Sequence, residues 1–264
     1  MRFSPPAVTM PDPVVITRPP AQAAELQRRV AALGREAIVF PLLDIQPLPD
    51  DRQLRQALRE LERYALVAFV SPNAIDAAFA ARPDWPHGVP LAVVGEGSRQ
   101  ALRRHGVPDG ARVFCPVDHE RSDSEGLLQA LDLAALRGKP VLILRGESGR
   151  ELLGDALRAA GAEVATVAAY RRAMPPFDEA RRRQLEQLLQ GPHDWLITSS
   201  EALRNLLDMA ARLKLADGIA TMQGQRLIVP HMRIAETARA LGFTRIVQSR
   251  SGDDGLIAAL QSCS

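Results

Sequence analysis

Two arginines are placed in the sequence where they could bind carboxylates. Arg18 follows the apolar run Val14-Val15-Ile16-Thr17, and Arg145 follows the similar run Val141-Leu142-Ile143-Leu144. An arginine guanidinium is planar and binds a carboxylate through two parallel hydrogen bonds. Alternatively, both arginines could form ordinary ion pairs at the protein surface, and the sequence favours neither role. The arginines therefore predict either carboxylate clamps or structural ion pairs.

Short polar and glycine-containing segments follow several of the apolar runs. Each precedes a stretch with helical periodicity, so its Ser, Thr or Gly is most simply a helix N-cap or a turn residue. Many helix N-termini at one edge of a sheet would nevertheless offer free N–H groups and positive dipole ends to an anion. Together they predict a ligand that carries carboxylates or phosphates. The segments are Arg18-Pro19, Ser71-Pro72-Asn73, Gly95-Glu96-Gly97-Ser98, Arg145-Gly146-Glu147-Ser148, Thr198-Ser199-Ser200 and His231.

Motifs for cofactors and metals are incomplete. Gly95-Glu96-Gly97 lacks the third glycine of a dinucleotide-binding fingerprint, and no phosphate-binding loop ends in Gly-Lys-Ser/Thr. The five histidines show neither the HxxxH nor the HxH spacing of metal sites. We therefore expect no cofactor and no metal.

Strand-like runs alternate with amphipathic helical stretches along the chain. The run from Val14 is followed by Leu26, Val30 and Leu33 at helical spacing, and this stretch ends at Gly34. Such alternation predicts an α/β protein, with parallel sheets that carry helices on both faces. Ligands of such sheets bind beyond the carboxyl ends of the strands, where the polar segments lie.

The two halves of the sequence resemble each other. VVITRP from Val14 matches VLILRG from Val141, and FVSPNA from Phe69 matches ITSSEA from Ile197. LAVVGEGSRQALRRHG matches LIVPHMRIAETARALG, with Gly106 and Gly242 at equivalent ends, and DSEGLLQAL matches GDDGLIAAL. A repeat of more than 100 residues indicates a duplicated domain and not a solenoid unit. The sequence thus predicts two related lobes.

Each half also contains a proline-rich connector. The connectors are FPLLDIQPLPD, from Phe40, and VAAYRRAMPPFD, from Val167. Extended segments that end in prolines favour a linker over a packed helix. Both are candidate hinges, and Tyr170 in the second either packs there or takes part in chemistry.

Composition limits the class of protein. The 264 residues are enough for two domains, with 46% hydrophobic and 24% charged residues, as in soluble globular proteins. The 33 basic and 31 acidic residues nearly cancel, which argues against nucleic acid as a partner. Two cysteines without metal or disulfide spacing, no membrane-length apolar run and a proline-rich leader without a signal-peptide pattern predict a cytoplasmic protein.

The paired elements, in this order, resemble the uroporphyrinogen-III synthase family. The resemblance extends from about Val14 to Leu260. It is carried by VVITRP, FVSPNAI, VVGEGSRQAL, DSEGLL, LILRGESGRELLGDALRAAGAEV with the following Tyr170, and LITSSEALRNL.

The resemblance implies a fold and a reaction. Two flavodoxin-like lobes would be joined by a two-stranded hinge, with the first strand and helix of each half in the lobe of the other half. Lobe one would comprise residues 1–41 and 170–264, and lobe two residues 42–169. The implied enzyme cyclises hydroxymethylbilane, a linear tetrapyrrole with eight carboxylates, with loss of water and inversion of ring D. A monomer suffices, because the duplication already supplies two lobes.

The resemblance also assigns residues. Tyr170 corresponds to the family tyrosine that assists departure of the hydroxyl as a proton donor, and Ser71, Ser199 and Arg226 align with positions around the substrate. Where some members have a Gly-Pro-Thr-Thr turn, this chain has His231-Met232-Arg233-Ile234, so His231, Arg233 or backbone N–H groups would replace the threonines. The predicted substrate-binding residues are Arg18, Ser71, Asn73, Ser124, Arg145, Gly146, Ser199, Arg226 and His231.

Two other functions are compatible with two α/β lobes. A nucleotide-sugar transferase also holds its ligand between such lobes, although lobes of this length are small for it and its site residues are not evident. A solute-binding protein that closes about a hinge is the non-enzymatic alternative.

Overall fold

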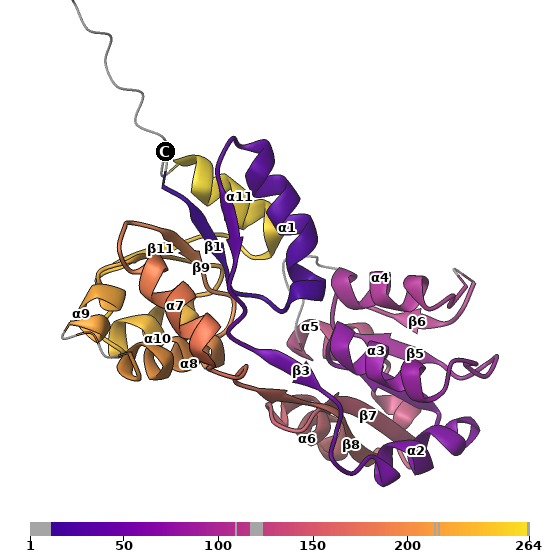
Figure 1. The fold of residues 1–264 in the computed structure, drawn as a ribbon. Coiled ribbons are helices and arrows are strands. Elements are labelled where there is room, and N and C mark those ends of the chain that lie inside the picture. Colours follow the sequence, from indigo (N-terminus) through magenta and orange to yellow (C-terminus); the bar gives the residue numbers. More distant parts are fainter. Residues whose placement is uncertain (1–11, 109, 117–123, 214, 216, 263–264) are drawn as a thin grey trace, which may run out of the picture. The chain divides into compact units, whose positions relative to one another are not determined.

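The structure, a computed structural model, describes residues 12–108, 110–116, 124–213, 215 and 217–262. The leader and Cys263 lie outside the described residues. The chain divides into two compact units (Figure 1). Residues 1–44 and 173–264 belong to unit 1, and residues 45–172 form unit 2.

Unit 1 is built on a five-stranded parallel sheet in the order β11-β10-β9-β1-β2. In the centre of this sheet Val15 of β1 lies opposite Ile38 of β2 and Trp195 of β9. The N-terminal strand therefore completes a sheet whose remaining central strands come from the C-terminal part of the chain. The strands are β1 (Val14–Ile16), β2 (Ala37–Val39), β9 (Asp194–Leu196), β10 (Arg226–Val229) and β11 (Arg245–Gln248).

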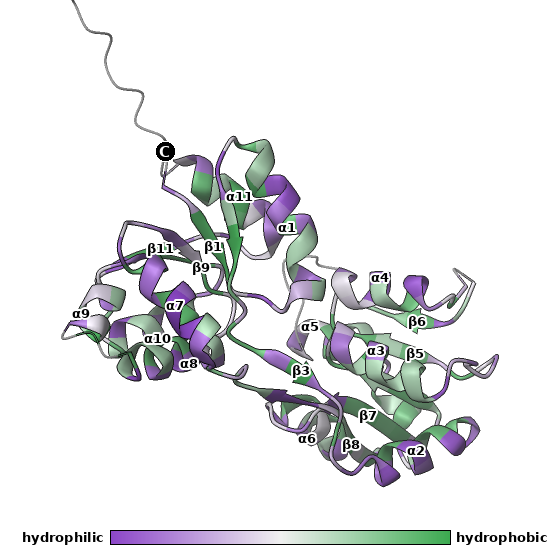
Figure 2. Ribbon diagram, in the orientation of Figure 1, coloured by the Kyte–Doolittle hydropathy of each residue, from purple (hydrophilic) through white to green (hydrophobic). Residues whose placement is uncertain are grey.

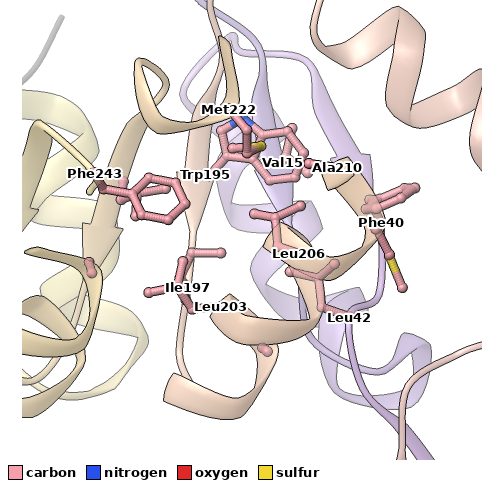
Figure 3. Packing of buried hydrophobic residues seen from close by; sticks show 14 of the residues in the cluster. Val15, Phe40, Leu42, Trp195, Ile197, Leu203, Leu206, Ala210, Met222 and Phe243 are labelled. Atoms are coloured by element: carbon pink, nitrogen blue, oxygen red, sulfur yellow. The ribbon is translucent and has the colours of Figure 1, made fainter. Parts of the chain in front are cut away.

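Helices cover both faces of this sheet, because successive side chains of a strand point to opposite faces. Val15 packs into the core beneath α7, α8, α9 and α10, together with Trp195 and Leu206 (Figure 3). Val14 and Ile16 pack against α1 and α11. The central strand β1 is apolar, whereas the covering helix α1 mixes hydrophilic and hydrophobic residues (Figure 2). The helices are α1 (Pro20–Ala32), α7 (Glu179–Leu188), α8 (Ser200–Ala211), α9 (Gly218–Gln223), α10 (Met232–Ala240) and α11 (Gly252–Ser262).

Unit 2 is built on a six-stranded sheet in the order β3-β8-β7-β4-β5-β6, in which the strands from β8 to β6 are parallel. One face packs against α2, α3 and α4, and the other against α5 and α6. The strands are β3 (Asp44–Gln46), β4 (Leu66–Phe69), β5 (Leu91–Val93), β6 (Val113–Phe114), β7 (Pro140–Gly146) and β8 (Glu163–Ala173). The helices are α2 (Arg52–Arg59), η1 (Leu61–Arg63), α3 (Pro72–Ala81), α4 (Glu96–Arg104), α5 (Ser124–Ala130), η2 (Ala134–Leu136) and α6 (Leu152–Ala159).

The two sheets repeat one strand order. The order β2-β1-β9-β10-β11 in unit 1 corresponds to β8-β7-β4-β5-β6 in unit 2, and both follow the flavodoxin-like pattern. Gly106 and Gly242 end the equivalent helices α4 and α10 with φ of 78° and 84°, a conformation that favours glycine. The predicted fold class, two mostly parallel sheets surrounded by helices, is confirmed.

Candidate active site

The candidate site in unit 2 lies at the carboxyl edge of the sheet, where β4 and β7 end side by side. The connection after β4 leads to α3 on one face, whereas the connection after β7 leads to α6 on the other. Open α/β sheets bind their ligands at such a switch in direction. Ser71 follows β4 and Gly146 ends β7, so two predicted site residues flank this position.

The Tyr170 hydroxyl is held beside Ser71. The phenolic oxygen lies 3.2 Å from Ser71 Oγ. Ser71 is the N-cap of α3, and its Oγ accepts the Ala74 N–H at 3.2 Å. Tyr170 as a whole residue is 5% exposed and belongs to the apolar core beneath α3. The core therefore fixes the ring while the hydroxyl reaches the N-terminus of a helix.

An irregularity beside Gly146 sets the position of Tyr170. The pairing of β7 with β8 runs regularly until Arg145 lies opposite Ala168, and then Gly146 lies opposite Tyr170. One extra residue of β8 is thus inserted, which is a β-bulge. The Glu147 N–H then donates to the Tyr170 carbonyl at 2.8 Å. The shift brings the tyrosine ring against the backbone of Gly146.

Arg145 turns into the loop that follows β7. Its side chain is buried and forms an ion pair with Glu151. Gly149 has φ of 152°, and a Cβ there would lie 2.6 Å from Arg145 Nη2. Arg172 holds the same loop from β8 by donating to the backbone oxygen and Oγ of Ser148, both at 3.3 Å. Arg145 therefore organises its own loop in this structure.

Other residues of unit 2 also lie at this edge. Asn73 is in the first turn of α3, and Ser124 begins α5; both are half-buried. Cys115 follows β6. Burial raises the pKa of the Cys115 thiol, and the nearby charge of Arg99 partly opposes this change, whereas that of Glu96 adds to it.

Unit 1 has the equivalent switch between β1 and β9. The buried Thr17 hydroxyl, just after β1, donates to the Leu196 carbonyl at the end of β9 at 2.7 Å. Arg18, the next residue, is partly exposed and forms an ion pair with Asp253 at 2.7 Å. The Arg18 guanidinium thus lies at the carboxyl edge of the unit 1 sheet, as predicted, and its partner there is the carboxylate of Asp253.

Two predicted residues of unit 1 cap helices at the same edge. Ser199 follows β9, and its Oγ accepts the N–H groups of Glu201 at 3.2 Å and Ala202 at 3.4 Å. His231 follows β10, and its Nδ1 accepts the Arg233 N–H at 3.2 Å. His231 thus serves as the N-cap of α10.

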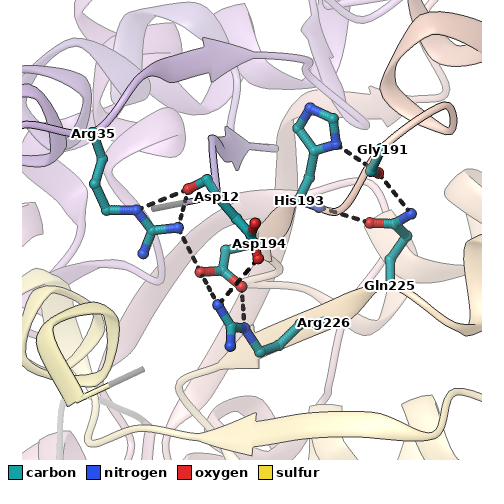
Figure 4. Close-up of polar contacts among 7 residues, drawn as sticks. All are labelled: Asp12, Arg35, Gly191, His193, Asp194, Gln225 and Arg226. Atoms are coloured by element: carbon teal, nitrogen blue, oxygen red, sulfur yellow. Dashed lines mark hydrogen bonds and ion pairs between the residues drawn. The ribbon is translucent and has the colours of Figure 1, made fainter. Parts of the chain in front are cut away.

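Arg226 lies elsewhere. It is the first residue of β10 and hence at the amino edge, opposite to Ser199 and His231. Its Nη2 donates to Asp194 at 2.8 Å, and Asp194, which is 0% exposed, also accepts from Arg35 at 2.6 Å (Figure 4). The predicted role for Arg226 beside the substrate stays a prediction, and the position at the amino edge favours a structural role, because open α/β sheets bind ligands at the carboxyl ends of their strands.

Asp194 and Arg35 were not among the residues predicted from the sequence. The available signal was Asp194 immediately before the buried run Trp195-Leu196-Ile197, since a carboxylate at a strand entrance needs a partner if it is buried. Nothing local pointed to Arg35 as that partner, because it is 159 residues distant in sequence.

The described parts of the chain contain neither a candidate metal centre nor a membrane-spanning helix. Within them no group of three or more His, Cys, Asp or Glu side chains could hold a metal ion. Nor does any helix there have the length and apolar character to cross a membrane.

Comparison with known sequences gives a consistent result over nearly the whole chain. The family model described as uroporphyrinogen-III synthase HemD matches residues 24–258. The uroporphyrinogen-III synthase of Escherichia coli K12 is 34% identical over 258 residues, which cover 94% of this chain and 99% of that protein. The synthase of Salmonella typhimurium LT2 is 33% identical, with coverage of 94% and 99%.

Solved structures agree on the fold. The structure of uroporphyrinogen-III synthetase from Helicobacter pylori 26695 matches with a TM-score of 0.63 and 12% identity, covering 96% of this chain and 100% of that one. A mutant uroporphyrinogen III synthase from the extremely thermophilic bacterium Thermus thermophilus matches with a TM-score of 0.56 and 17% identity, covering 95% and 98%. At these identities the likeness concerns the fold alone.

Proposed function

This chain belongs to the uroporphyrinogen-III synthase family, and from that premise we propose that it cyclises hydroxymethylbilane to uroporphyrinogen III. The observation that carries the proposal is the match with the E. coli synthase over nearly the full length of both chains. The same match sets aside the transferase and the solute-binding protein as alternatives.

Tyr170 donates the proton that the first step requires. The bond between the hydroxymethyl carbon and its oxygen breaks, and the lone pair of the pyrrole nitrogen supplies the electrons to the carbon. The departing hydroxyl takes the Tyr170 proton and leaves as water, so that an azafulvenium cation, which keeps its pyrrole N–H, and a phenolate remain. The buried ring keeps the phenol in one position, which favours general-acid assistance.

Ring closure then needs positioning more than further acid–base groups. The substituted carbon of ring D attacks the azafulvenium carbon, and the resulting N-protonated spiro-pyrrolenine opens and recloses with ring D inverted. The ring carbon that forms the final bond loses a proton, which returns to the Tyr170 phenolate. One water is lost in total, and the enzyme regains its starting state. No cofactor takes part in any step.

The substrate carboxylates bind to helix N-termini at the carboxyl edge of each sheet. Donors are the N–H groups around Ser71, Asn73 and Gly146 in unit 2, and those around Ser199 and His231 in unit 1. Ser124 contributes in the same way at the start of α5, and Arg18 adds a charged donor. Arg145 acts indirectly, since it shapes the loop after Gly146, and Arg226 serves the stability of unit 1.

Hydroxymethylbilane generated in the assay by a coupled enzyme provides the test. The isomers are oxidised and separated by chromatography, and only isomer III counts, because isomer I forms spontaneously. We expect isomer III at full rate after exhaustive chelation and dialysis. Isomer I alone would overturn the proposal, and activity restored only by added metal would overturn its cofactor-free form.

The protein acts as a cytoplasmic monomer in this proposal. The internal duplication supports the monomer, since each sheet edge recurs within a single chain. Sedimentation of the purified protein across a range of concentrations tests this. A stable dimer at assay concentrations would contradict it.

A further inference from the structure

The hydroxyl of Ser71 contacts two groups, the Ala74 N–H and the Tyr170 hydroxyl, and it can donate only one hydrogen bond. A serine hydroxyl has one proton to donate and two lone pairs to accept. One lone pair receives the Ala74 N–H, which caps α3. The other neighbour is the Tyr170 oxygen at 3.2 Å, and geometry allows either oxygen to be the donor in this contact.

The two directions have different consequences for Tyr170. If Tyr170 donates to Ser71, its proton points away from any departing group. If Ser71 donates to Tyr170, the phenol proton stays available, and the contact becomes stronger when the phenolate forms. A buried phenolate without a donor is costly, and the positive end of the ten-residue helix α3 favours negative charge nearby.

We propose that Ser71 is a positioning residue, which donates its proton to the phenolic oxygen of Tyr170 and thereby connects that oxygen to the N-terminus of α3. This inference rests on the proposed function for its catalytic consequence, but the direction of the hydrogen bond is a property of the protein alone. Ser71 then acts through Tyr170 and not as a ligand of a substrate carboxylate.

The repeat offers an internal comparison. Ser199 is the counterpart of Ser71 and caps α8 in the same way. In the aligned connectors, however, the residue that matches Tyr170 is Leu43, which is buried and apolar. Capping alone therefore does not require a tyrosine. The Ser–Tyr contact is an addition in one half, at the site where a proton donor is proposed.

Three variants separate capping from donation. Ser71→Gly removes the hydroxyl but leaves a residue that is acceptable at an N-cap, and Ser71→Thr keeps both functions. Asp178, whose side chain accepts the Arg181 N–H at the start of α7, gives the matched control Asp178→Gly. We expect Ser71→Gly to lower kcat by about 10- to 100-fold, the range for a hydrogen bond to a charged group. KM should change little, Ser71→Thr should restore most of kcat, and Asp178→Gly should keep it.

A rise in KM with kcat retained would instead make Ser71 a substrate ligand and overturn the inference. Equal losses of kcat in Ser71→Gly and Ser71→Thr would also overturn the inference, since the threonine hydroxyl can still donate a hydrogen bond.

A spectroscopic measurement does not depend on activity. The chain has two tyrosines, so in Tyr64→Phe protein Tyr170 is the sole phenol. The intensity ratio of its ring doublet in ultraviolet resonance Raman spectra differs between a phenol that accepts and one that donates. In the Tyr64→Phe protein we expect the intensity ratio of a phenol that accepts a hydrogen bond. We expect this ratio to be lost when Ser71→Gly is added. A donating ratio would overturn the inference, even if the protein forms isomer III. An accepting ratio in a protein that forms only isomer I would overturn the proposed function instead.

Discussion

A β-carbon on Gly146 would lie 3.1 Å from Cζ and 3.2 Å from the phenolic oxygen of Tyr170. Ordinary contacts between carbon atoms are about 3.5–4.0 Å. Gly146 is not among the glycines with positive φ, so its backbone conformation does not require glycine. What requires glycine is the space that the tyrosine ring and its hydroxyl occupy.

Gly146→Ala should therefore displace the Tyr170 ring by a few tenths of an ångström. We expect kcat to fall by about 10- to 100-fold, because small misplacements of a catalytic group are expensive. Overpacking should also lower the free energy of unfolding by about 1–3 kcal/mol. Rates of isomer III formation and thermal melting measure the two effects.

Gly191→Ala is the matched control for this substitution. A Cβ at Gly191 meets no atom within 4 Å, and this residue also lacks a positive φ. Wild-type kcat is expected for it. If Gly146→Ala kept wild-type kcat as well, the close contact with Tyr170 would have no catalytic meaning.

Tyr170→Phe removes the proposed proton donor and leaves the ring in the core. We expect kcat to fall on the order of 10²-fold, which is what general-acid assistance can supply, with little change in substrate affinity. Single-turnover rates and product binding measure these quantities. Tyr64→Phe, which alters the other tyrosine, is the control and should behave as wild type. A loss smaller than about tenfold would mean that the pyrrole nitrogen drives departure and that Tyr170 mainly orients the substrate.

The fold class could be predicted because its causes are local and repeated. Alternating apolar runs and amphipathic stretches gave the two mostly parallel sheets, and the repeat indicated that their strands are equivalent. The residues Ser71, Ser199 and His231 stand before helices in the sequence, and they cap them in the structure. Capping depends on the next three residues, which the sequence displays.

The directions of the charged side chains could not be predicted in this way. Arg18 and Arg145 occupy equivalent positions in the sequence, yet Arg18 is paired with Asp253, whereas Arg145 is buried in its own loop. The contact of Ser71 with Tyr170 spans 99 residues and depends on the bulge after Arg145. Bulges and long-range partners leave no periodic trace in a single sequence.

Arg18 and Asp253 provide a test of the carboxylate clamp. If Arg18 binds a substrate carboxylate, Arg18→Ala should weaken product binding by about 1.5–3 kcal/mol, the range for hydrogen bonds to charged groups. Asp253→Ala removes the competing carboxylate and should keep or increase the affinity. Titration calorimetry with uroporphyrin III measures both. Wild-type affinity in Arg18→Ala would place the arginine outside the binding site and leave only its ion pair with Asp253.

Cys115 should react slowly with alkylating agents at neutral pH. Burial raises the pKa of its thiol, so the reactive thiolate is scarcer than in a small free thiol at the same pH. The folded state favours the neutral thiol, so this shift adds to the free energy of unfolding at a pH below the pKa that the thiol has in the unfolded chain. The added stability is lost as the pH rises through the pKa that the thiol has in the folded protein. Iodoacetamide rates between neutral and alkaline pH, in a Cys263→Ser background and against glutathione, measure the shift. A rate at neutral pH equal to that of glutathione would contradict it.

Asp194 should be important for the stability of unit 1 and unimportant for chemistry. Its carboxylate is fully buried and binds Arg35 and Arg226, so Asp194→Ala would leave the buried Arg35 guanidinium with the Asp12 carbonyl and no carboxylate to pair with. Loss of one partner from a buried ion pair costs about 3–5 kcal/mol. Urea unfolding, followed by the fluorescence of the neighbouring Trp195, should show this loss.

The matched control is Asp254, which pairs with Arg29 but has a side chain that is 90% exposed. Exposed pairs contribute about 0–1 kcal/mol, so Asp254→Ala should shift the unfolding midpoint little. High salt should also weaken the effect of Asp254→Ala and leave that of Asp194→Ala nearly intact, because buried charges are screened less. If Asp194→Ala remained folded with wild-type stability but lost product binding, the cluster would belong to the ligand site, and the structural role assigned to Arg226 would be wrong.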